Sequence, residues 1–319
     1  MRQFCTSIDS DRLIQGLGLC HSLGRHEPGA PLWVLCLDRP VEKVLERLQL
    51  PDVHPVPLAE LESAEPTLRG ARDFRSRDEY HLTATPAFLW HLLTRVPDTA
   101  PLTFVAPELC FFASPAALVA ESSSGSIALT PRRFPPRRER LARYGRYDPG
   151  WITFLDDRSG REALAWWRNR CIEWCHARLE DGKFGAQKYL DDWTTRFQGV
   201  HVLANPGAGV APWNVDALPV GTGAGGPTVG SAPLVFYHFH GFERISSWLY
   251  EPGLARYGAS LTPELRQAIY EPYLLELRGI ERTLRREVPG APRGWGSARG
   301  FGLGALIRHA LTKQLLVAR

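Results

Sequence analysis

The run Pro31-Leu-Trp-Val-Leu-Cys-Leu37 is continuously apolar and ends at Asp38. An uninterrupted apolar run closed by a charged residue is typical of a β-strand that is buried on both faces. A shorter apolar stretch, Arg2 to Ser7, precedes it, and the segment between the two, Leu13 to Leu23, has the pattern of a helix. Strand, helix and strand at this spacing predict a parallel sheet with crossover helices.

The same alternation continues along the chain. We expect helices at Val41 to Leu48, Thr83 to Arg95 and, the longest, Arg161 to Arg178, and strands at Leu102 to Val105, Ser126 to Thr130, Gly150 to Phe154 and Leu234 to Tyr237. In parallel sheets, ligands bind beyond the carboxyl ends of the strands. This rule puts Thr6, Ser7, Asp9 and Asp38 at the mouth of the expected cleft.

The later part of the chain has a different composition. The Gly- and Ala-rich segment Leu218 to Ser231 predicts a flexible connection without a fixed conformation. Its glycines lack the preceding strand and the following helix of a dinucleotide-binding loop. Beyond it, charged amphipathic patterns predict helices at Thr262 to Glu287 and Leu303 to Val317.

Size and charge limit the classes of protein that the chain can represent. Its 319 residues suffice for one large α/β domain or two smaller ones. The net charge of +4 is modest and does not indicate a nucleic-acid partner. No apolar run reaches the ~18 residues of a membrane span, and no signal peptide precedes Thr6. We therefore expect a cytoplasmic protein without a membrane span.

The six cysteines lie in apolar surroundings without a C-x-x-C pair, which predicts buried free thiols. Cys171 and Cys175, four residues apart on an expected helix, leave a metal-binding pair open as the alternative.

Three segments carry a family resemblance: Lys183-Phe-Gly-Ala-Gln-Lys-Tyr-Leu-Asp-Asp-Trp193, Pro206 to Asn214, and Tyr237-His-Phe-His-Gly241. In this order they resemble the second half of bacterial nucleotide-diphospho-sugar transferases, which are GT-A-type glycosyltransferases distantly similar to the glycogenin-like retaining enzymes. The resemblance covers Phe4 to about Trp248. It implies an α/β, Rossmann-like, mainly parallel twisted sheet flanked by helices.

The same resemblance divides the chain. It predicts a glycosyltransferase domain over residues 1–248, with a nucleotide-binding half (1–125) and a half for the donor sugar and acceptor (126–248). Residues 249–319 would form a C-terminal helical extension.

Four polar positions of the family pattern are changed. An Asp-x-Asp pair that holds a divalent cation is replaced by Ala106 and Glu108, Asn-x-Gly becomes Asp148-Pro-Gly150, and the Asp before Gln187 becomes Ala186. A single carboxylate binds such a cation weakly. We therefore expect no metal and a metal-independent site, although a metal held by His238 and His240 stays open.

The resemblance assigns roles to the remaining residues. The catalytic set is Gln187, Asp148 and Glu108. The nucleotide and diphosphate set is Thr6, Ser7, Asp9, Asp38, Arg77, Arg133 and His240. The cleft for sugar and acceptor is lined by Trp213, Asn214, His238 and Ala186. By the period of two in a strand, His238 and His240 share one face.

Arginines offer a substitute for the metal, because guanidinium groups bind phosphate oxygens in pairs. Seven arginines crowd between Arg132 and Arg146, and Arg132 and Arg133 follow a strand end. The alternative is a solvated, disordered basic loop. For Arg77 the alternative is an ordinary surface position.

These features predict a nucleotide-sugar-dependent glycosyltransferase, retaining and metal-independent, with a UDP-sugar as the first candidate donor. Its acceptor would be a small molecule, a glycan or a peptide. Two alternatives stay open: an inactive scaffold that binds a nucleotide or a partner, and an enzyme with a different reaction on the same fold.

Overall fold

A seven-stranded sheet forms the centre of the protein, seen in a computed structural model that describes residues 2–95, 100–123, 125–296 and 314–318. Its strand order is β3-β2-β1-β4-β7-β6-β8. The strands are β1 (Gln3–Ile8), β2 (Leu32–Cys36), β3 (Val53–Pro57), β4 (Leu102–Val105), β6 (Ile127–Pro131), β7 (Tyr147–Phe154) and β8 (Val200–Val202). Strand β7 is antiparallel to both of its neighbours, and the other pairs are parallel. The predicted mainly parallel α/β sheet is confirmed.

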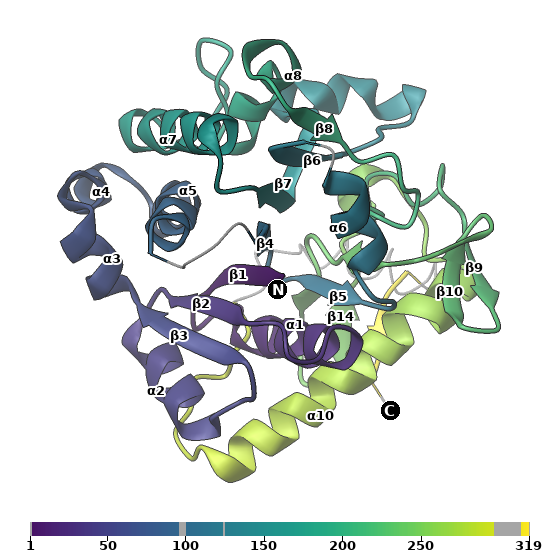
Figure 1. Ribbon diagram of the computed structural model, residues 1–319. Coiled ribbons are helices and arrows are strands. Elements are labelled where there is room, and N and C mark those ends of the chain that lie inside the picture. The colour runs from purple at the N-terminus through teal and green to yellow at the C-terminus, as the bar shows by residue number, and fades with distance from the viewer. Residues whose placement is uncertain (1, 96–99, 124, 297–313, 319) are drawn as a thin grey trace.

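Helices cover both faces of this sheet (Figure 1). One face carries α1 (Leu13–His26), α2 (Arg39–Leu48) and α10 (Glu271–Glu287), and the other carries α5 (Arg77–Leu93) and α7 (Arg158–Glu173). Strands β1 and β4 lie between these layers, and their side chains are almost entirely buried. The continuous apolar runs in the sequence have this physical origin, because neither face of these strands meets water.

The remaining helices are short: α3 (Leu58–Ala64), α4 (Pro66–Ala71), α6 (Ala116–Ser122), α8 (Trp193–Arg196) and α9 (Pro263–Leu265). Helix α9 continues through a π-helical turn at Arg266–Tyr270 into α10, so the predicted helix from Thr262 to Glu287 is confirmed. Helix α10 packs on α1 (Figure 1). The C-terminal part therefore contacts the first half of the chain directly.

The carboxyl ends of β1 and β2 meet at one edge, as predicted. Ser7 pairs with Leu35 in the parallel ladder. Just beyond the strands, Asp38 accepts hydrogen bonds from the backbone and the hydroxyl of Ser10, at 2.8 and 2.9 Å. The same carboxylate accepts the N–H of Val41 and so caps the start of α2. Asp38 thus joins two strand ends to a helix.

A second, smaller layer lies beside the main sheet. Strand β5 (Leu109–Phe111) pairs antiparallel with β12 (Phe236–His238). Strands β13 (Glu243–Arg244), β14 (Leu249–Glu251) and β15 (Leu316–Val317) form another sheet. The β5–β12 pair matters for function, because it joins the end of the first half of the chain to the segment that carries both histidines.

The prediction of a flexible connection from Leu218 to Ser231 was wrong. This segment forms β9 (Val220–Gly223) and β10 (Gly226–Val229), which pair antiparallel, and β11 (Ala232–Pro233) extends the sheet. The glycines serve the tight turn, where Gly226 has a φ of 121° that other residues avoid. Composition alone does not distinguish such a turn from a linker.

Two helix predictions also need correction. Helix α7 ends at Glu173, so Trp174 and Cys175 lie beyond it, and both α5 and α10 are longer. The helix expected from Leu303 to Val317 lies mostly outside the described residues, and its last two residues form β15 instead. All six cysteines are buried and free, as predicted.

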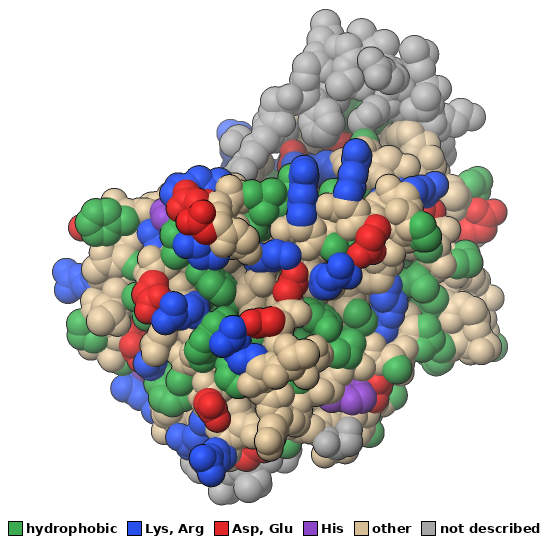
Figure 2. Space-filling view, turned by 90° about the horizontal axis from the view of Figure 1, so that it is seen from above, with side chains coloured by type: hydrophobic (Ala, Val, Ile, Leu, Met, Phe, Trp, Pro, Cys, Tyr) green, Lys and Arg blue, Asp and Glu red, His purple; other side chains and the backbone are tan. Residues whose placement is uncertain are grey.

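On the face shown in Figure 2, Lys and Arg side chains are interspersed with Asp and Glu. Among the described residues, no helix combines the length and the apolar composition that crossing a bilayer requires.

Candidate active site

Three distant segments meet where β4 ends. The N–H of Ala106 donates to the carbonyl of Gly150 at 2.9 Å, which holds the first residues of β7 beside the end of β4. The N–H of Phe239 donates to the carbonyl of Glu108 at 3.0 Å, which fixes the end of β12 there as well. These backbone bonds gather the polar residues of three motifs: Glu108, Asp148, His238 and His240.

A cavity of about 260 Å³ opens at this point, and a second of about 320 Å³ adjoins it. Together they reach the size of small-molecule sites in proteins, ~300–1,000 Å³. Eight predicted site residues line the first cavity: Ser7, Asp9, Glu108, Asp148, Ala186, Gln187, His238 and His240. Asp9, Glu108 and His240 also line the second. The resemblance therefore identified residues that the fold brings together.

His238 is held between two carboxylates. Its Nδ1 lies 2.7 Å from Asp148, and its Nε2 lies 3.4 Å from Glu108. Burial lowers the pKa of the imidazole, but the charges of Asp148 and Glu108 outweigh burial and raise the pKa to about 9. The pKa of Asp148 falls well below its usual range, because the attraction of His238 exceeds the cost of burial.

The charge of His238 lowers the pKa of both Glu108 and His240. Burial raises the pKa of Glu108, but the hydrogen bond and charge of His238, with that of Arg12, lower it to about 2. Burial and the neighbouring charge of His238 lower the pKa of His240 to about 4. His240 is therefore neutral near pH 7, and its ring lone pair is available to a ligand.

Gly150 makes the pair of Asp148 and His238 possible. A Cβ atom added at this position would lie 2.9 Å from the Cε1 atom of His238. The N–H of Gly150 also donates to the Asp148 carboxylate at 3.1 Å. Any larger residue would displace the imidazole ring from Asp148.

Trp213 and Asn214 lie behind the cavity, not in its lining as predicted. The Trp213 ring packs edge-on against His238 and His240, and the side chain is buried. Asn214 is fully buried, and its amide donates to the carbonyls of Arg132 and Gly209. Trp213 therefore packs directly on the histidines, and Asn214 ties the loop of Trp213 to the backbone of Arg132.

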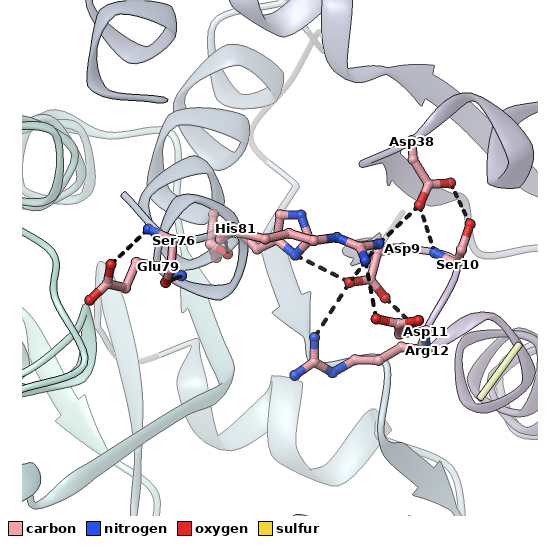
Figure 3. Close-up of polar contacts among 10 residues, drawn as sticks. Asp9, Ser10, Asp11, Arg12, Asp38, Ser76, Glu79 and His81 are labelled. Atoms are coloured by element: carbon pink, nitrogen blue, oxygen red, sulfur yellow. Dashed lines mark hydrogen bonds and ion pairs between the residues drawn. The ribbon is translucent and has the colours of Figure 1, made fainter. Parts of the chain in front are cut away.

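A cluster of charges surrounds Asp9 at the end of β1 (Figure 3). His81 Nδ1 lies 3.3 Å from the Asp9 carboxylate, and Arg12 lies 3.8 Å from it. Arg77, predicted to bind the diphosphate, contacts Asp9, Asp11 and Asp38 at 3.1 to 3.4 Å instead. Its charge is largely balanced by these carboxylates, and Arg77 does not line either cavity.

Two further nucleotide-site predictions do not match the placement of the side chains. The side chains of Thr6 and Ser7 point to opposite faces of β1. Ser7 lines the first cavity, whereas Thr6 is fully buried. Asp38 serves the Ser10 and Val41 contacts described above and lines neither cavity. Neither group faces the space that a nucleotide would occupy.

Arg133 was predicted to face the cleft and does not. Its guanidinium donates to the carbonyls of Leu203, Asn205 and Ala208 at 2.5 to 3.1 Å. Arg132, by contrast, lines the first cavity and lies over the Trp213 ring, 5.1 Å from its centroid. The rest of the segment is no disordered loop, because residues Pro136–Tyr144 form a 3-10 helix.

The sequence analysis missed Arg12 and His81, and also Asp78, which lines both cavities. Arg12 precedes α1 and lines both cavities, and His81 projects from α5 toward Asp9. None of the three belongs to the motifs of the resemblance. In the sequence, a position after a strand end or on the first turns of a long helix is only a weak indication of a site residue.

A metal-independent site was expected from the sequence, with a metal held by His238 and His240 as the open alternative. Ligand atoms of Glu108, His238 and His240 lie within 4.8 Å of one another.

Two curated proteins of Bacillus subtilis (strain 168) are similar over most of their length. YfnD is 32% identical over 278 residues, covering 86% of this chain and 88% of YfnD. YfnF is 31% identical over 251 residues, covering 76% and 82%. The chain belongs to the family of YfnD and YfnF. Both relatives are uncharacterized proteins, and no family model matches the chain.

Solved structures give the fold of this family. The galactosyltransferase LgtC, crystallised with donor and acceptor sugar analogs, matches with a TM-score of 0.54 at 11% identity, over 90% of this chain and 100% of LgtC. Apo GlyE, a glycosyltransferase of Streptococcus pneumoniae TIGR4, matches with a TM-score of 0.51 at 13% identity, over 90% of this chain and 63% of GlyE. The chain has the GT-A glycosyltransferase fold.

Arg133→Ala should destabilise the protein rather than weaken ligand binding. The change removes three bonds from a charged donor to the carbonyls of Leu203, Asn205 and Ala208, of which Asn205 keeps the N–H of Ala208 as a partner. We expect a cost of about 3 kcal/mol in the free energy of unfolding. Urea unfolding measures this difference. Arg146→Ala, which removes an exposed ion pair with Glu139, serves as the control and should change stability by less than about 1 kcal/mol. Equal stability of both variants would show that the carbonyl contacts contribute nothing.

Proposed function

We propose that this protein transfers a glycosyl group from a nucleotide sugar to an acceptor. The observation that carries the proposal is the meeting of Gln187 and Ala186 with Asp148, Glu108 and both histidines around one cavity of a GT-A fold. Fold likeness alone would not support an activity. The residues of the three motifs line one cavity, and this arrangement supports an enzymatic activity where the fold alone does not.

The nucleotide would lie over the end of β1, against Ser7 and Asp9, where Leu37, Leu82 and Phe104 provide apolar surface. The diphosphate would lie between Arg12 and Arg132, beside Glu108 and His240. Guanidinium groups hold phosphate oxygens through charge-assisted bonds that are stronger than neutral ones. This arrangement replaces Arg77 and Arg133 in the role that the sequence suggested for them.

The donor sugar would lie near Gln187 and Asp148. In this arrangement the protein positions the reacting carbon and excludes water, and charge stabilisation acts on the departing diphosphate. We further propose a retaining outcome, in which the departing diphosphate accepts the proton of the acceptor hydroxyl. This follows the resemblance to glycogenin-like retaining enzymes.

The second cavity is a suitable place for the acceptor. It adjoins the first through Asp9, Glu108 and His240, and it carries Arg244 and Arg256 with the ring of Trp295. An aromatic face and charged donors together are suited to sugars and to anionic acceptors. Small-molecule, glycan and peptide acceptors all stay within this proposal.

A thermal-shift screen tests the donor site directly. The full chain is heated with UDP, GDP, CDP, ADP and their sugars, with and without a divalent cation. One nucleotide should raise the midpoint, since a ligand at 100 times its Kd adds about 2.7 kcal/mol to stability. A shift that persists in the Arg146→Ala control and is lost on changing Arg132 to Ala would support the assigned cavity. No shift with any nucleotide would contradict the proposal.

An inactive scaffold is the second candidate, and Ala186 is the observation that favours it. The family pattern has an Asp here, whereas Ala186 is buried and its carbonyl accepts the Trp167 indole N–H at 2.9 Å. The methyl group of Ala186 cannot form a hydrogen bond with a sugar hydroxyl. The two candidates differ in what a carboxylate restored at this position would do.

Ala186→Asp should lower transfer from the native donor by at least about tenfold, equivalent to about 1.4 kcal/mol. A buried, unpaired carboxylate costs several kcal/mol or takes up a proton. Ala186→Asn, of equal size and without charge, is the matched control and should cost less. Transfer or donor hydrolysis that rises in Ala186→Asp would instead indicate a glycosyltransferase that has lost its activity.

A further inference from the structure

We propose that the donor sugar of this protein is a 6-deoxyhexose, which is a hexose with a methyl group in place of its CH₂OH group. This inference rests on the proposed function, because it names the sugar for the site assigned there. It follows from the part of the first cavity where the donor sugar would lie. The end of β4, the start of β7 and the segment around Ala186 and Gln187 form this part.

The side chains that line this part of the cavity are almost all apolar. We call the apolar ones the apolar wall, and they are Ala106, Pro107, Pro149, Trp167 and Ala186. Ala106 and Ala186 both stand where the family pattern has an aspartate. Two carboxylates that could accept hydrogen bonds from hydroxyl groups are thus replaced by methyl groups.

The backbone of the apolar wall offers a sugar few hydrogen bonds. Pro107 and Pro149 have no N–H to donate. The N–H of Ala106 donates to the carbonyl of Gly150 at 2.9 Å, and the carbonyl of Ala106 accepts the N–H of Leu109 at 3.0 Å. These backbone groups already have partners within the protein.

The polar atoms of Trp167 and Asp148 have partners as well. The indole N–H of Trp167 donates to the carbonyl of Ala186 at 2.9 Å, so the ring offers only carbon to a ligand. One carboxylate oxygen of Asp148 lies 2.7 Å from His238 Nδ1, and the other accepts the N–H of Gly150 at 3.1 Å. Asp148 therefore serves the protein before it serves a sugar.

Gln187 is the exception among the residues of this part. Its side chain lines the cavity, and its amide forms no hydrogen bond with another described residue. A Cβ atom added at Gly185 would lie 2.6 Å from Oε1 of Gln187, so this glycine leaves the amide its space. One amide has two donor hydrogens and one acceptor oxygen. Gln187 can therefore orient the sugar ring, but it cannot pair with every hydroxyl of a hexose.

The charged groups of the same cavity have other assignments. Arg12 and Arg132 would hold the diphosphate, with Glu108 beside it. The Asp9 carboxylate lies 3.3 Å from His81 Nδ1 at the end of β1. The sugar is thus left with Gln187 and the apolar wall.

The cost of burying a hydroxyl decides which sugar fits. A hydroxyl that moves from water to a site without a partner loses its hydrogen bonds, which disfavours a fully hydroxylated hexose. A methyl group in the same place loses none and removes apolar surface from water. Apolar pockets reject an added hydroxyl only moderately, by about 100-fold at most. We therefore expect a preference for the 6-deoxy sugar of about 10- to 100-fold.

Isothermal titration calorimetry of the full chain with pairs of donors that differ by one oxygen tests the proposal. The pairs are UDP-glucose with UDP-6-deoxyglucose, UDP-galactose with UDP-6-deoxygalactose, GDP-mannose with GDP-6-deoxymannose, and CDP-glucose with CDP-6-deoxyglucose. In the pair that binds most tightly, the Kd of the 6-deoxy donor should be about 10- to 100-fold lower. Equal Kd values, or a lower Kd for the hexose donor, would overturn the proposal.

Ala186→Ser tests the apolar wall itself. The added hydroxyl gives a sugar hydroxyl a partner, so the ratio of the two Kd values should fall toward one. Ala120→Ser makes the same change at an exposed position of α6 outside both cavities, and it should keep the native ratio. Circular dichroism checks that both variants are folded. A native ratio in Ala186→Ser would show that the wall does not contact the sugar.

UDP, GDP and CDP, titrated without a sugar, separate this proposal from the proposed function. If one of them binds and the hexose donor on that nucleotide binds as tightly as its 6-deoxy counterpart, the donor site stands and the 6-deoxy sugar is wrong. If neither the nucleoside diphosphates nor their sugars bind, the proposed function fails, and the assignment of the sugar fails with it.

Discussion

The hydrogen bond between Asp148 and His238 is the contact on which the site depends. It joins the start of β7 to the end of β12, two strands of different sheets, and both side chains are nearly excluded from water. Removing one partner of a buried ion pair costs about 3–5 kcal/mol, since the other charge stays buried and unpaired. The pair therefore holds the sheets together and fixes the direction of His238 Nε2.

Several neighbouring features follow from this contact. Gly150 must lack a side chain because the imidazole ring occupies that space. Trp213 packs edge-on against His238 and His240, with the guanidinium of Arg132 over its ring. Asn214 ties the loop of Trp213 to the backbone of Arg132. A loop that was expected to contact the substrate is thus a support for the histidines, and its buried hydrogen bonds give it the rigidity that a positioned site requires.

The main sheet could be predicted because its signal is local. Strand β2 is a continuous apolar run, β1 and β4 are rich in apolar residues, and the ends of β1 and β2 meet as the parallel pairing requires. The pairing of His238 with His240 on one face followed from the period of two. The β9–β10 hairpin was missed because its glycines have the composition of a linker, and only pairing with a partner strand distinguishes the two cases.

The roles of the arginines could not be predicted, for a physical reason. A guanidinium can bind phosphate, carboxylate or carbonyl oxygens, so its partner depends on the three-dimensional fold. Arg77 has three carboxylates around it, Arg133 has three carbonyls, and Arg132 and Arg12 reach the cavity. The contact of His238 with Glu108 also depends on the fold, because it follows from the pairing of β5 with β12, which the motif does not contain.

A crystal structure of the protein with a bound nucleoside diphosphate tests the central claim most directly. The account predicts the diphosphate between Arg12 and Arg132, beside Glu108 and His240, with His238 still bonded to Asp148. A nucleotide bound outside this cavity, or a His238 imidazole turned away from Asp148, would contradict it.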